Sequence, residues 1–336
     1  MNTIRLKNIQ TNKNLFSEKV WKRLSLELNR IVNKNKKTNS CPVCKSRKIS
    51  FYIKKNGFNM FKCFNCNLIF SNPYPSKKQL EYYYKSSIKK NENRNFRKSF
   101  EKRINIFLPR VKIIKEYLNS GKLLDIGSAI GIFVEALKRS NHNFSITCCD
   151  IDFDSCNELR KKYSNIKILN KDYTKINSKF DIITMWDTVE HIQNLNLLFK
   201  KIRKLLNKKG FFFFSTPNTK SFEWYVAGKN HGQILPPGHI NLLNLKSIKI
   251  LFKKNNFEFI DILTLNPSLD IDTVNNLIKS NPVSQNKIKN FFNIYCSNKK
   301  EDYISKIRNK NFRHAFEKLL IKKKLAGNMI IIGKKK

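Results

Sequence analysis

Short apolar runs alternate with amphipathic segments from residue 122 to residue 218. The apolar runs have the length of buried strands, whereas the amphipathic segments repeat at a helical period. Alternating strands and helices joined by right-handed crossovers predict a parallel sheet covered on both faces. The predicted strands are residues 122–127, 144–150, 166–169, 180–187 and 210–218, and the predicted helices are residues 132–140, 154–163 and 195–207.

The pattern continues toward the C-terminus. Residues 245–265 predict a helix followed by a strand, and residues 328–335 predict a last strand. The segment between these elements is too long for a hairpin. We therefore expect a helical insertion at about residues 267–325.

Two helices are predicted nearer the N-terminus. Residues 17–37 carry apolar side chains at roughly helical intervals, which indicates an amphipathic helix. A second helix is expected to begin at Ser76, whose hydroxyl can cap it. The apolar residues of the first helix are Val20, Leu24, Leu26 and Ile31.

Residues 88–102 are polar and charged, and we expect a mobile connection there. Apolar spacing resumes at Ile104 and predicts a helix that ends at Gly121. From these patterns we divide the chain into a helical extension (1–38), a small cysteine-containing ribbon (39–75), a helical linker (76–120) and an α/β domain (121–336).

The composition is that of a globular protein. The chain has 336 residues, of which 40% are hydrophobic, so it can bury a full core. It has no apolar run long enough to span a bilayer, and its first residues lack the apolar region of a secretory signal. We therefore expect a cytoplasmic protein without a membrane span.

The formal net charge of +43 raises the question of nucleic-acid binding. Lysines are spread over every segment, however, and accompany high asparagine, isoleucine and phenylalanine usage. A nucleic-acid site would instead combine a basic stripe with stacking aromatic side chains. We interpret the lysines as a compositional bias and expect no nucleic-acid partner.

Four of the eight cysteines form two C-x-x-C pairs, and Asn56-Gly57 predicts a hairpin turn between the pairs. Two such pairs brought together by a hairpin supply four sulfur ligands with no open position, as structural zinc requires. A closed site of this kind does no chemistry on a substrate. We therefore predict a structural Zn²⁺ and seek the reaction elsewhere. The predicted ligands are Cys41, Cys44, Cys63 and Cys66.

The first predicted strand of the α/β domain runs into the sequence DIGSAIG. Gly127 and Gly131 allow the backbone to approach a ligand closely. Asp125 would repel a pyrophosphate but would suit a cationic ligand, and the spacing differs from that of a dinucleotide site. Asp150 ends the second strand, where an acid can accept hydrogen bonds from both hydroxyls of a ribose. A nucleoside with a positively charged amino-acid tail fits both carboxylates.

Six motifs in order resemble those of class I S-adenosylmethionine-dependent methyltransferases: LLDIGSAIG, CCDID, NKDYTKI, KFDIITMWDTVEHI, LLNKKGFFFFSTPN and PPGHINLLN. Because the cysteine ribbon precedes these motifs, the chain resembles the branch of this family that modifies sugars and other small molecules. The resemblance implies a Rossmann-like, seven-stranded α/β methyltransferase sheet with a small N-terminal zinc ribbon and helical extensions. It also implies S-adenosyl-L-methionine as cofactor and a small-molecule acceptor such as a nucleotide sugar or glycan precursor.

The resemblance also implies positions for the cofactor. The methionine moiety would lie at Asp125, Gly127 and Gly131, the ribose at Asp150, and the adenine near Asp172 and Tyr173. Ala129 departs from the pattern, since the family more often has glycine there. The full set of expected cofactor-binding residues is Asp125, Gly127, Ser128, Gly131, Asp150, Ile151, Asp172, Tyr173 and Trp186.

Two histidines are candidates for proton transfer, because histidine is the side chain most nearly poised for it at neutral pH. His239 lies in a loop expected to cover the acceptor, and the resemblance to sugar C-methyltransferases implies that it is the base. His191 follows the fourth strand and is the other candidate. Asp187, Glu190 and His191 also resemble an arrangement in quinone-pathway O-methyltransferases that can hold a divalent ion.

Two alternatives remain open from the sequence. A ribosomal or transfer RNA methyltransferase would use the basic surface, although the motif that grips a flipped base is missing after the fourth strand. A zinc-ribbon binding protein without catalysis would not need the acids and glycines that this chain keeps.

Overall fold

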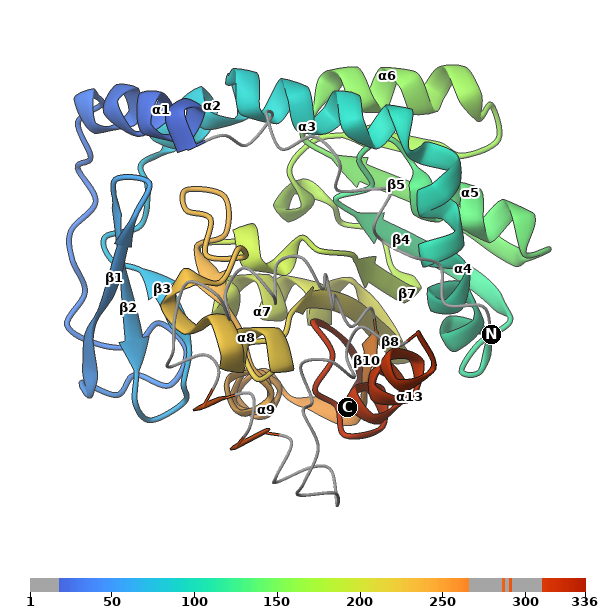
Figure 1. Ribbon diagram of the computed structural model, residues 1–336. Coiled ribbons are helices and arrows are strands. Elements are labelled where there is room, and N and C mark those ends of the chain that lie inside the picture. The colour runs from blue at the N-terminus through green and yellow to red at the C-terminus, as the bar shows by residue number, and fades with distance from the viewer. Residues whose placement is uncertain (1–17, 266–285, 288–289, 292–309) are drawn as a thin grey trace.

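The structure is a computed structural model that describes residues 18–265, 286–287, 290–291 and 310–336. A seven-stranded sheet forms its centre (Figure 1). The order across this sheet is β10-β11-β8-β7-β4-β5-β6. Its strands are β4 (Ser120–Ile126), β5 (Asn143–Asp150), β6 (Lys167–Asn170), β7 (Phe180–Met185), β8 (Leu206–Pro217), β10 (Phe257–Leu265) and β11 (Asn328–Lys335).

The sheet is mixed rather than wholly parallel. The five strands from β8 to β6 run parallel to one another, as the alternating pattern predicts. β11 lies antiparallel between β8 and β10, and the pattern predicted no direction for β10 or β11. The Rossmann-like α/β fold class with a seven-stranded sheet is confirmed.

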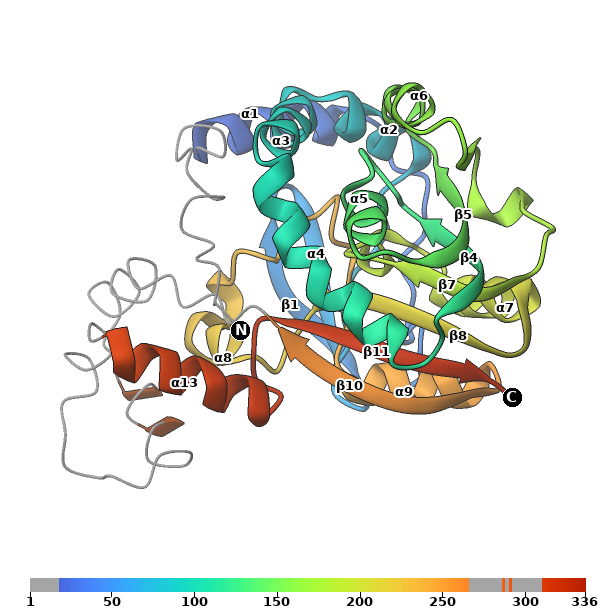
Figure 2. The same ribbon diagram turned by 90° about the vertical axis from the view of Figure 1, so that its right-hand side faces the viewer.

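Helices cover both faces of the sheet (Figure 2). Alternating side chains of each strand serve the two faces: Phe213 packs with α4, α5 and α6, whereas Phe212 and Phe214 pack with α7 and α9. Successive side chains of a strand point to opposite faces of the sheet, so a strand buried on both faces packs against helices on each side. These helices are α4 (Phe100–Lys115), α5 (Ile132–Arg139), α6 (Phe153–Lys162), α7 (Leu195–Leu205) and α9 (Leu245–Lys254).

The cysteine ribbon forms a second sheet with the order β1-β2-β3-β9. The predicted hairpin is β1 (Ile49–Lys55) and β2 (Phe58–Cys63), and β3 (Ile69–Ser71) follows it. The fourth strand, β9 (Asn241–Leu242), comes from far along the chain and pairs with β3. The ribbon is therefore completed by the segment that follows His239.

The N-terminal segments form helices α1 (Glu18–Arg30), α2 (Lys77–Lys85) and α3 (Ser87–Lys98). Leu24 and Leu28 form the buried face of α1, whereas Leu26 is 58% exposed and was wrongly placed on that face. Ser76 caps α2 as predicted, in a capping box with Gln79.

Two boundaries differ from the predictions. Residues 88–102 form most of α3 and the start of α4 instead of a mobile connection, because Ser86 caps α3 and Ile88 is buried beneath it. The next helix, α4, ends at Lys115, and Gly121 lies inside β4.

The remaining described elements are two helices and three short 3-10 turns. The helices are α8 (Phe222–Ala227) and α13 (Lys310–Lys322), and the turns are at Tyr173–Lys175, Val189–His191 and Gly228–Asn230. Most of the predicted insertion at 267–325, with Cys296, lies outside the described residues. Within the part of the chain that is described, no helix has the length and apolar character needed to cross a membrane.

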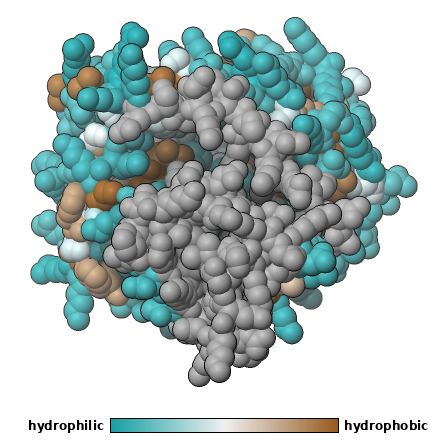
Figure 3. All heavy atoms as spheres, viewed as in Figure 1, coloured by the Kyte–Doolittle hydropathy of each residue, from teal (hydrophilic) through white to brown (hydrophobic). Residues whose placement is uncertain are grey.

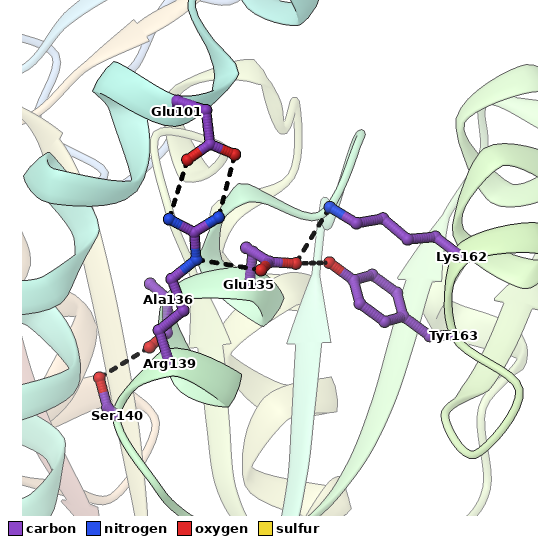
Figure 4. A network of polar contacts seen from close by, with 7 residues as sticks. All are labelled: Glu101, Glu135, Ala136, Arg139, Ser140, Lys162 and Tyr163. Atoms are coloured by element: carbon purple, nitrogen blue, oxygen red, sulfur yellow. Dashed lines mark hydrogen bonds and ion pairs between the residues drawn. The ribbon is translucent and has the colours of Figure 1, made fainter.

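A polar network ties α4, α5 and α6 together (Figure 4). Arg139 of α5 contacts both carboxylate oxygens of Glu101 at 2.8 and 2.9 Å and reaches Glu135 at 3.1 Å. Lys162 lies 3.0 Å from Glu135, and the Tyr163 hydroxyl donates to the same carboxylate. Burial opposes ionisation of Glu135, but its hydrogen bonds outweigh burial and lower its pKa to about 2.

We expect Glu135→Gln to lower the free energy of unfolding by about 1–3 kcal/mol at pH 7, because the amide cannot replace the charge-assisted contacts. The pKa of Glu135 is lowered on folding, so its contribution is present above pH 4.5 and is lost as the pH falls toward about 2. Urea unfolding at several pH values measures the difference between variant and wild type. An equal change from Glu116→Gln, on an exposed side chain, would contradict this role.

Candidate active site and cysteine centre

The four cysteines of the ribbon converge on one point. The Cys41 and Cys66 sulfurs lie 3.5 Å apart, as do those of Cys44 and Cys63. All four sulfurs lie within 4.8 Å of one another. Tetrahedral zinc with Zn–S bonds of about 2.3 Å needs sulfurs roughly 3.8 Å apart, so this geometry fits the ion.

The surroundings of the cluster suit a structural site. Cys41, Cys63 and Cys66 are fully buried, which leaves no room for a substrate. Hydrogen bonding with Cys66 lowers the pKa of Cys41 to about 5, and the same contact raises the pKa of Cys66. The lowered pKa of Cys41 favours the thiolate, the form that ligates a metal.

A second site lies at the carboxyl ends of the parallel strands. β5 lies on one side of β4 and β7 lies on the other, so the chain order reverses at β4. Ligands of open α/β sheets bind at such a switch point. Most of the predicted cofactor residues and His191 follow β4, β5, β6 or β7, whereas His239 lies between β8 and β9 and reaches this edge through its contact with His191.

The loop after β4 is shaped by its glycines. Gly127 and Gly131 have φ values of 77° and 79°, a region that L-residues rarely adopt. An added Cβ would lie 2.5 Å from the Thr188 hydroxyl at Gly127 and 2.3 Å from Leu159 at Gly131. Ala129 is also left-handed, with φ of 44°, which explains why glycine is the more usual residue there.

Asp150 holds this loop from the end of β5. Its carboxylate accepts hydrogen bonds from the backbone N–H groups of Ala129 at 2.8 Å and Asp152 at 2.9 Å. Burial raises the pKa of Asp150, although these N–H groups favour its ionised form. An ionised carboxylate has about four acceptor positions, so it can still bind two ligand hydroxyls.

Asp125 is buried beneath the loop at the end of β4. It is 2% exposed, and its carboxylate accepts a hydrogen bond of 2.7 Å from the Thr184 hydroxyl on β7. Burial raises the pKa of Asp125 to about 7. A cation near the loop would favour the charged form of Asp125.

The other predicted cofactor residues surround this edge of the sheet. Asp172 is exposed and caps the 3-10 turn that contains Tyr173, and Ile151 is also exposed. Ser128 and Trp186 are buried, and neither the Ser128 hydroxyl nor the Trp186 indole N–H has a partner among the described residues.

Arg110 was missed by the sequence analysis. Its side chain is 3% exposed on α4 and contacts Asp187 at 3.3 Å. Its guanidinium carbon lies 4.1 Å from the Phe107 ring centroid and 5.2 Å from that of Trp186. Its Nε and Nη1 have no partner in the described structure. Buried donors without acceptors indicate a place for an anionic group. The sequence does not reveal this role of Arg110, because only the fold brings α4 beside the end of β7.

The two histidines lie together, although 48 positions separate them. The ring centroids of His191 and His239 are 4.9 Å apart. His239 Nδ1 lies 3.0 Å from the Gln233 carbonyl oxygen. Because a carbonyl oxygen only accepts, Nδ1 carries the proton in this hydrogen bond and Nε2 keeps a lone pair. Burial lowers the pKa of both histidines and so favours their neutral form.

Glu190 completes this cluster. One ligand atom each from Glu190, His191 and His239 lies within 4.8 Å of the others. Glu190 is 1% exposed, and burial raises its pKa well above the usual value. The Asp187 carboxylate is instead engaged with Arg110, Ser215 and Asn328. The group that could hold a divalent ion therefore contains His239 in place of Asp187.

Comparisons with known proteins agree with this architecture. A family model described as a methyltransferase domain matches residues 78–262. Ubiquinone biosynthesis O-methyltransferase of Coxiella burnetii is 30% identical over 142 residues, which are 38% of this chain and 59% of that protein. The enzyme of the same name from Bartonella quintana is 31% identical over 166 residues, covering 44% of this chain and 66% of its own. The chain thus spans less than two thirds of these curated relatives.

Solved structures also match the chain at low identity. A SAM-dependent methyltransferase from Archaeoglobus fulgidus is 15% identical, with a TM-score of 0.46 over 69% of this chain and 94% of that one. Coclaurine N-methyltransferase bound to N-methylheliamine and SAH is 16% identical, with a TM-score of 0.43 over 70% of this chain and 73% of that one.

Proposed function

This chain belongs to the methyltransferase domain family, whose model matches more than half of it, and we propose that it transfers a methyl group from S-adenosyl-L-methionine to a small molecule. The observation that carries the proposal is the edge of the sheet at β4, β5 and β7. There the glycine loop, the Asp150 carboxylate and the two histidines lie at the switch point of one sheet. When bound, the cofactor would supply an electrophilic methyl group on a sulfonium.

The chain's own residues fit the parts of this cofactor. Asp150 can accept from the ribose hydroxyls while it holds the loop through Ala129. Asp125 is buried beside the loop and would favour the positive charge of the sulfonium and amino group. The partnerless donors of Arg110 and Trp186 suit the carboxylate at the other end of the amino-acid tail. Asp172 and Tyr173 would lie toward the adenine.

Binding of the cofactor is the direct test. We expect Asp150→Ala to weaken the affinity for S-adenosylmethionine by about 1.5–3 kcal/mol, because two charge-assisted hydrogen bonds are lost and the loop loses its anchor at Ala129. Titration calorimetry measures the change. Asp154→Ala is the matched control, since it removes an exposed carboxylate from the start of α6.

Two results would overturn the assignment. One is calorimetric heat from a nicotinamide dinucleotide with none from S-adenosylmethionine. The other is an equal loss of affinity in the Asp154 and Asp150 variants.

The acceptor that we propose is a hydroxyl group of a small molecule. Methyl transfer to a hydroxyl requires a base, and the Nε2 lone pair of His239 provides one in the neutral ring. The curated relatives are named for O-methyl transfer in ubiquinone biosynthesis, which supports a hydroxyl. A nucleotide sugar or glycan precursor, the class implied by the ribbon, offers the same group.

We also propose that the ribbon carries one structural Zn²⁺. The distances between the four sulfurs and the burial of three of the cysteines support a closed site of four ligands. Cys44, which is partly exposed, would complete it. In this proposal the ion supports the fold and takes no part in the reaction.

A further inference from the structure

Acidic residues are absent from one long segment of the chain and nearly absent from a second. Residues 28–80 contain no aspartate or glutamate but twelve lysines and arginines. Residues 191–257 contain Glu223 alone against another twelve basic residues. Basic residues are therefore spread along the whole sequence, whereas the acidic residues that would offset their charge are concentrated outside these two segments.

The fold brings these two segments together. The side chain of Asn244, the cap of α9, donates to the Cys66 carbonyl at 3.0 Å, and Lys254 at the other end of α9 reaches the Val43 carbonyl at 2.7 Å. Asn196 at the start of α7 donates to the Pro42 carbonyl at 2.8 Å. The cysteine turns of the ribbon therefore adjoin α7 and α9. We use the name basic face for the surface formed by α7, α9 and the exposed side of the cysteine ribbon.

Exposed cations mark the basic face. None of them forms an ion pair within the described residues, in contrast to the paired charges of α3 to α6. Their ammonium and guanidinium groups are thus available to an external partner. These exposed cations are Lys45, Arg47, Lys48, Lys200, Lys246 and Lys253.

Large apolar side chains are exposed in the ribbon and on α7. Phe51 on the edge strand β1 is 56% exposed, Phe64 beside Cys63 is 61% exposed, and Leu197 on α7 is 50% exposed. In the view of Figure 3, apolar residues gather on the left-hand side, where Figure 1 places the ribbon. Apolar side chains that project among unpaired cations are typical of proteins that lie on a lipid surface.

We propose that the basic face docks on the surface of an anionic phospholipid bilayer. Lysine and arginine side chains would bind lipid phosphates, while Phe51, Phe64 and Leu197 would enter the boundary between headgroups and acyl chains. A single-stranded nucleic acid would use the aromatic rings as stacking platforms but has no use for an exposed leucine. The proposal does not depend on the proposed methyl transfer.

Vesicle co-sedimentation of the full-length, zinc-loaded protein tests the proposal. We expect binding to vesicles that contain phosphatidylglycerol and little binding to phosphatidylcholine alone. Neutralising three cations in Arg47→Gln/Lys48→Gln/Lys253→Gln should weaken binding roughly 100-fold, since each cation near an anionic surface contributes about five-fold. The matched control is Lys90→Gln/Lys112→Gln/Lys161→Gln, which removes the same charge from exposed positions on α3, α4 and α6.

A second pair of variants tests the apolar contacts. Phe51→Ser/Phe64→Ser should weaken binding at least ten-fold at high salt, where electrostatic attraction is screened. Phe153→Ser/Ile321→Ser, which removes two exposed apolar side chains elsewhere, should have little effect. Zinc content and circular dichroism confirm that each variant is folded.

Three outcomes would overturn the proposal. Equal losses of vesicle binding in the two triple variants would show that only the total charge of the protein matters. Equal binding to neutral and anionic vesicles would exclude recognition of lipid phosphate. An oligouridylate that binds the wild type and not the Arg47 variant, with no binding of anionic vesicles, would assign the basic face to nucleic acid.

Discussion

Replacing His239 by alanine is expected to lower the rate of methyl transfer roughly 10²–10⁴-fold and to leave the affinity for S-adenosylmethionine nearly unchanged. The reason is that Nε2 of the neutral ring would be the proton acceptor, while the cofactor would bind at the loop after β4. Single-turnover rates with a hydroxyl acceptor, together with calorimetry of cofactor binding, measure the two quantities separately.

A second substitution distinguishes a base from an anchor of the loop. His239→Asn places an amide N–H where it can donate to the Gln233 carbonyl but removes the basic nitrogen. The asparagine variant should therefore be as slow as the alanine variant. Recovery of activity in His239→Asn would contradict the catalytic role, and so would a rate that requires an added divalent ion. His142→Ala removes a histidine that directly precedes β5, at the end of the strand opposite Asp150, and serves as the control.

The pH dependence of the same reaction provides an independent check. Burial lowers the pKa of His239 below 6.5, with Lys89 lowering it further and Glu92 opposing this effect. The neutral ring is the active form, so the rate should rise with pH and reach half its maximum below pH 6.5. The low-pH limb should be absent from the His239→Asn variant.

Loss of the zinc ligands is expected to have the other large effect. Cys63→Ser/Cys66→Ser should abolish zinc binding, destabilise the ribbon by several kcal/mol and slow methyl transfer at least ten-fold. The rate should fall because β3 pairs with β9, which begins two residues after His239. Further contacts join the ribbon to the same segment: the Tyr74 hydroxyl donates to Asn241 and the Asn244 side chain donates to the Cys66 carbonyl.

Metal analysis, calorimetry of cofactor binding and single-turnover rates test this expectation together. Cofactor affinity should change little, because the loop after β4 is held by the Asp150 carboxylate at the end of β5. Cys156→Ala, at a buried cysteine outside the cluster, should keep its zinc. Full zinc content in the double variant, or an unchanged rate without zinc, would refute the coupling.

The sequence was most informative where one periodicity covers a whole element. The alternation of apolar runs and amphipathic segments predicted every parallel strand of the large sheet, since a strand buried on both faces is apolar throughout. β9 could not be predicted, because two residues carry no period and their partner lies in the ribbon. The helical structure of residues 88–102 was missed because α3, which holds most of them, is stabilised by the Ser86 cap and by packing of Ile88.

The residues of the candidate site also fall into those that the sequence could predict and those that only the fold reveals. Gly127 and Gly131 were predictable because a required backbone conformation restricts the residue type. The partnership of His239 with His191 and Glu190 depends on a loop that returns to the end of β7, which local sequence does not record. Arg110 resembles many other basic residues in the sequence, and only the fold places it beside two aromatic rings.

The pairing of β3 with β9 also bears on how the chain folds during synthesis. Ile69 and its partner Leu242 are more than 170 residues apart, so this contact has a high sequence separation and forms late. While the ribosome completes the intervening domain, β1, β2 and β3 form a sheet whose β3 edge offers unpaired N–H and carbonyl groups to other nascent chains. Early binding of metal by the four cysteines would hold this open-edged intermediate in its native register until β9 emerges and covers it.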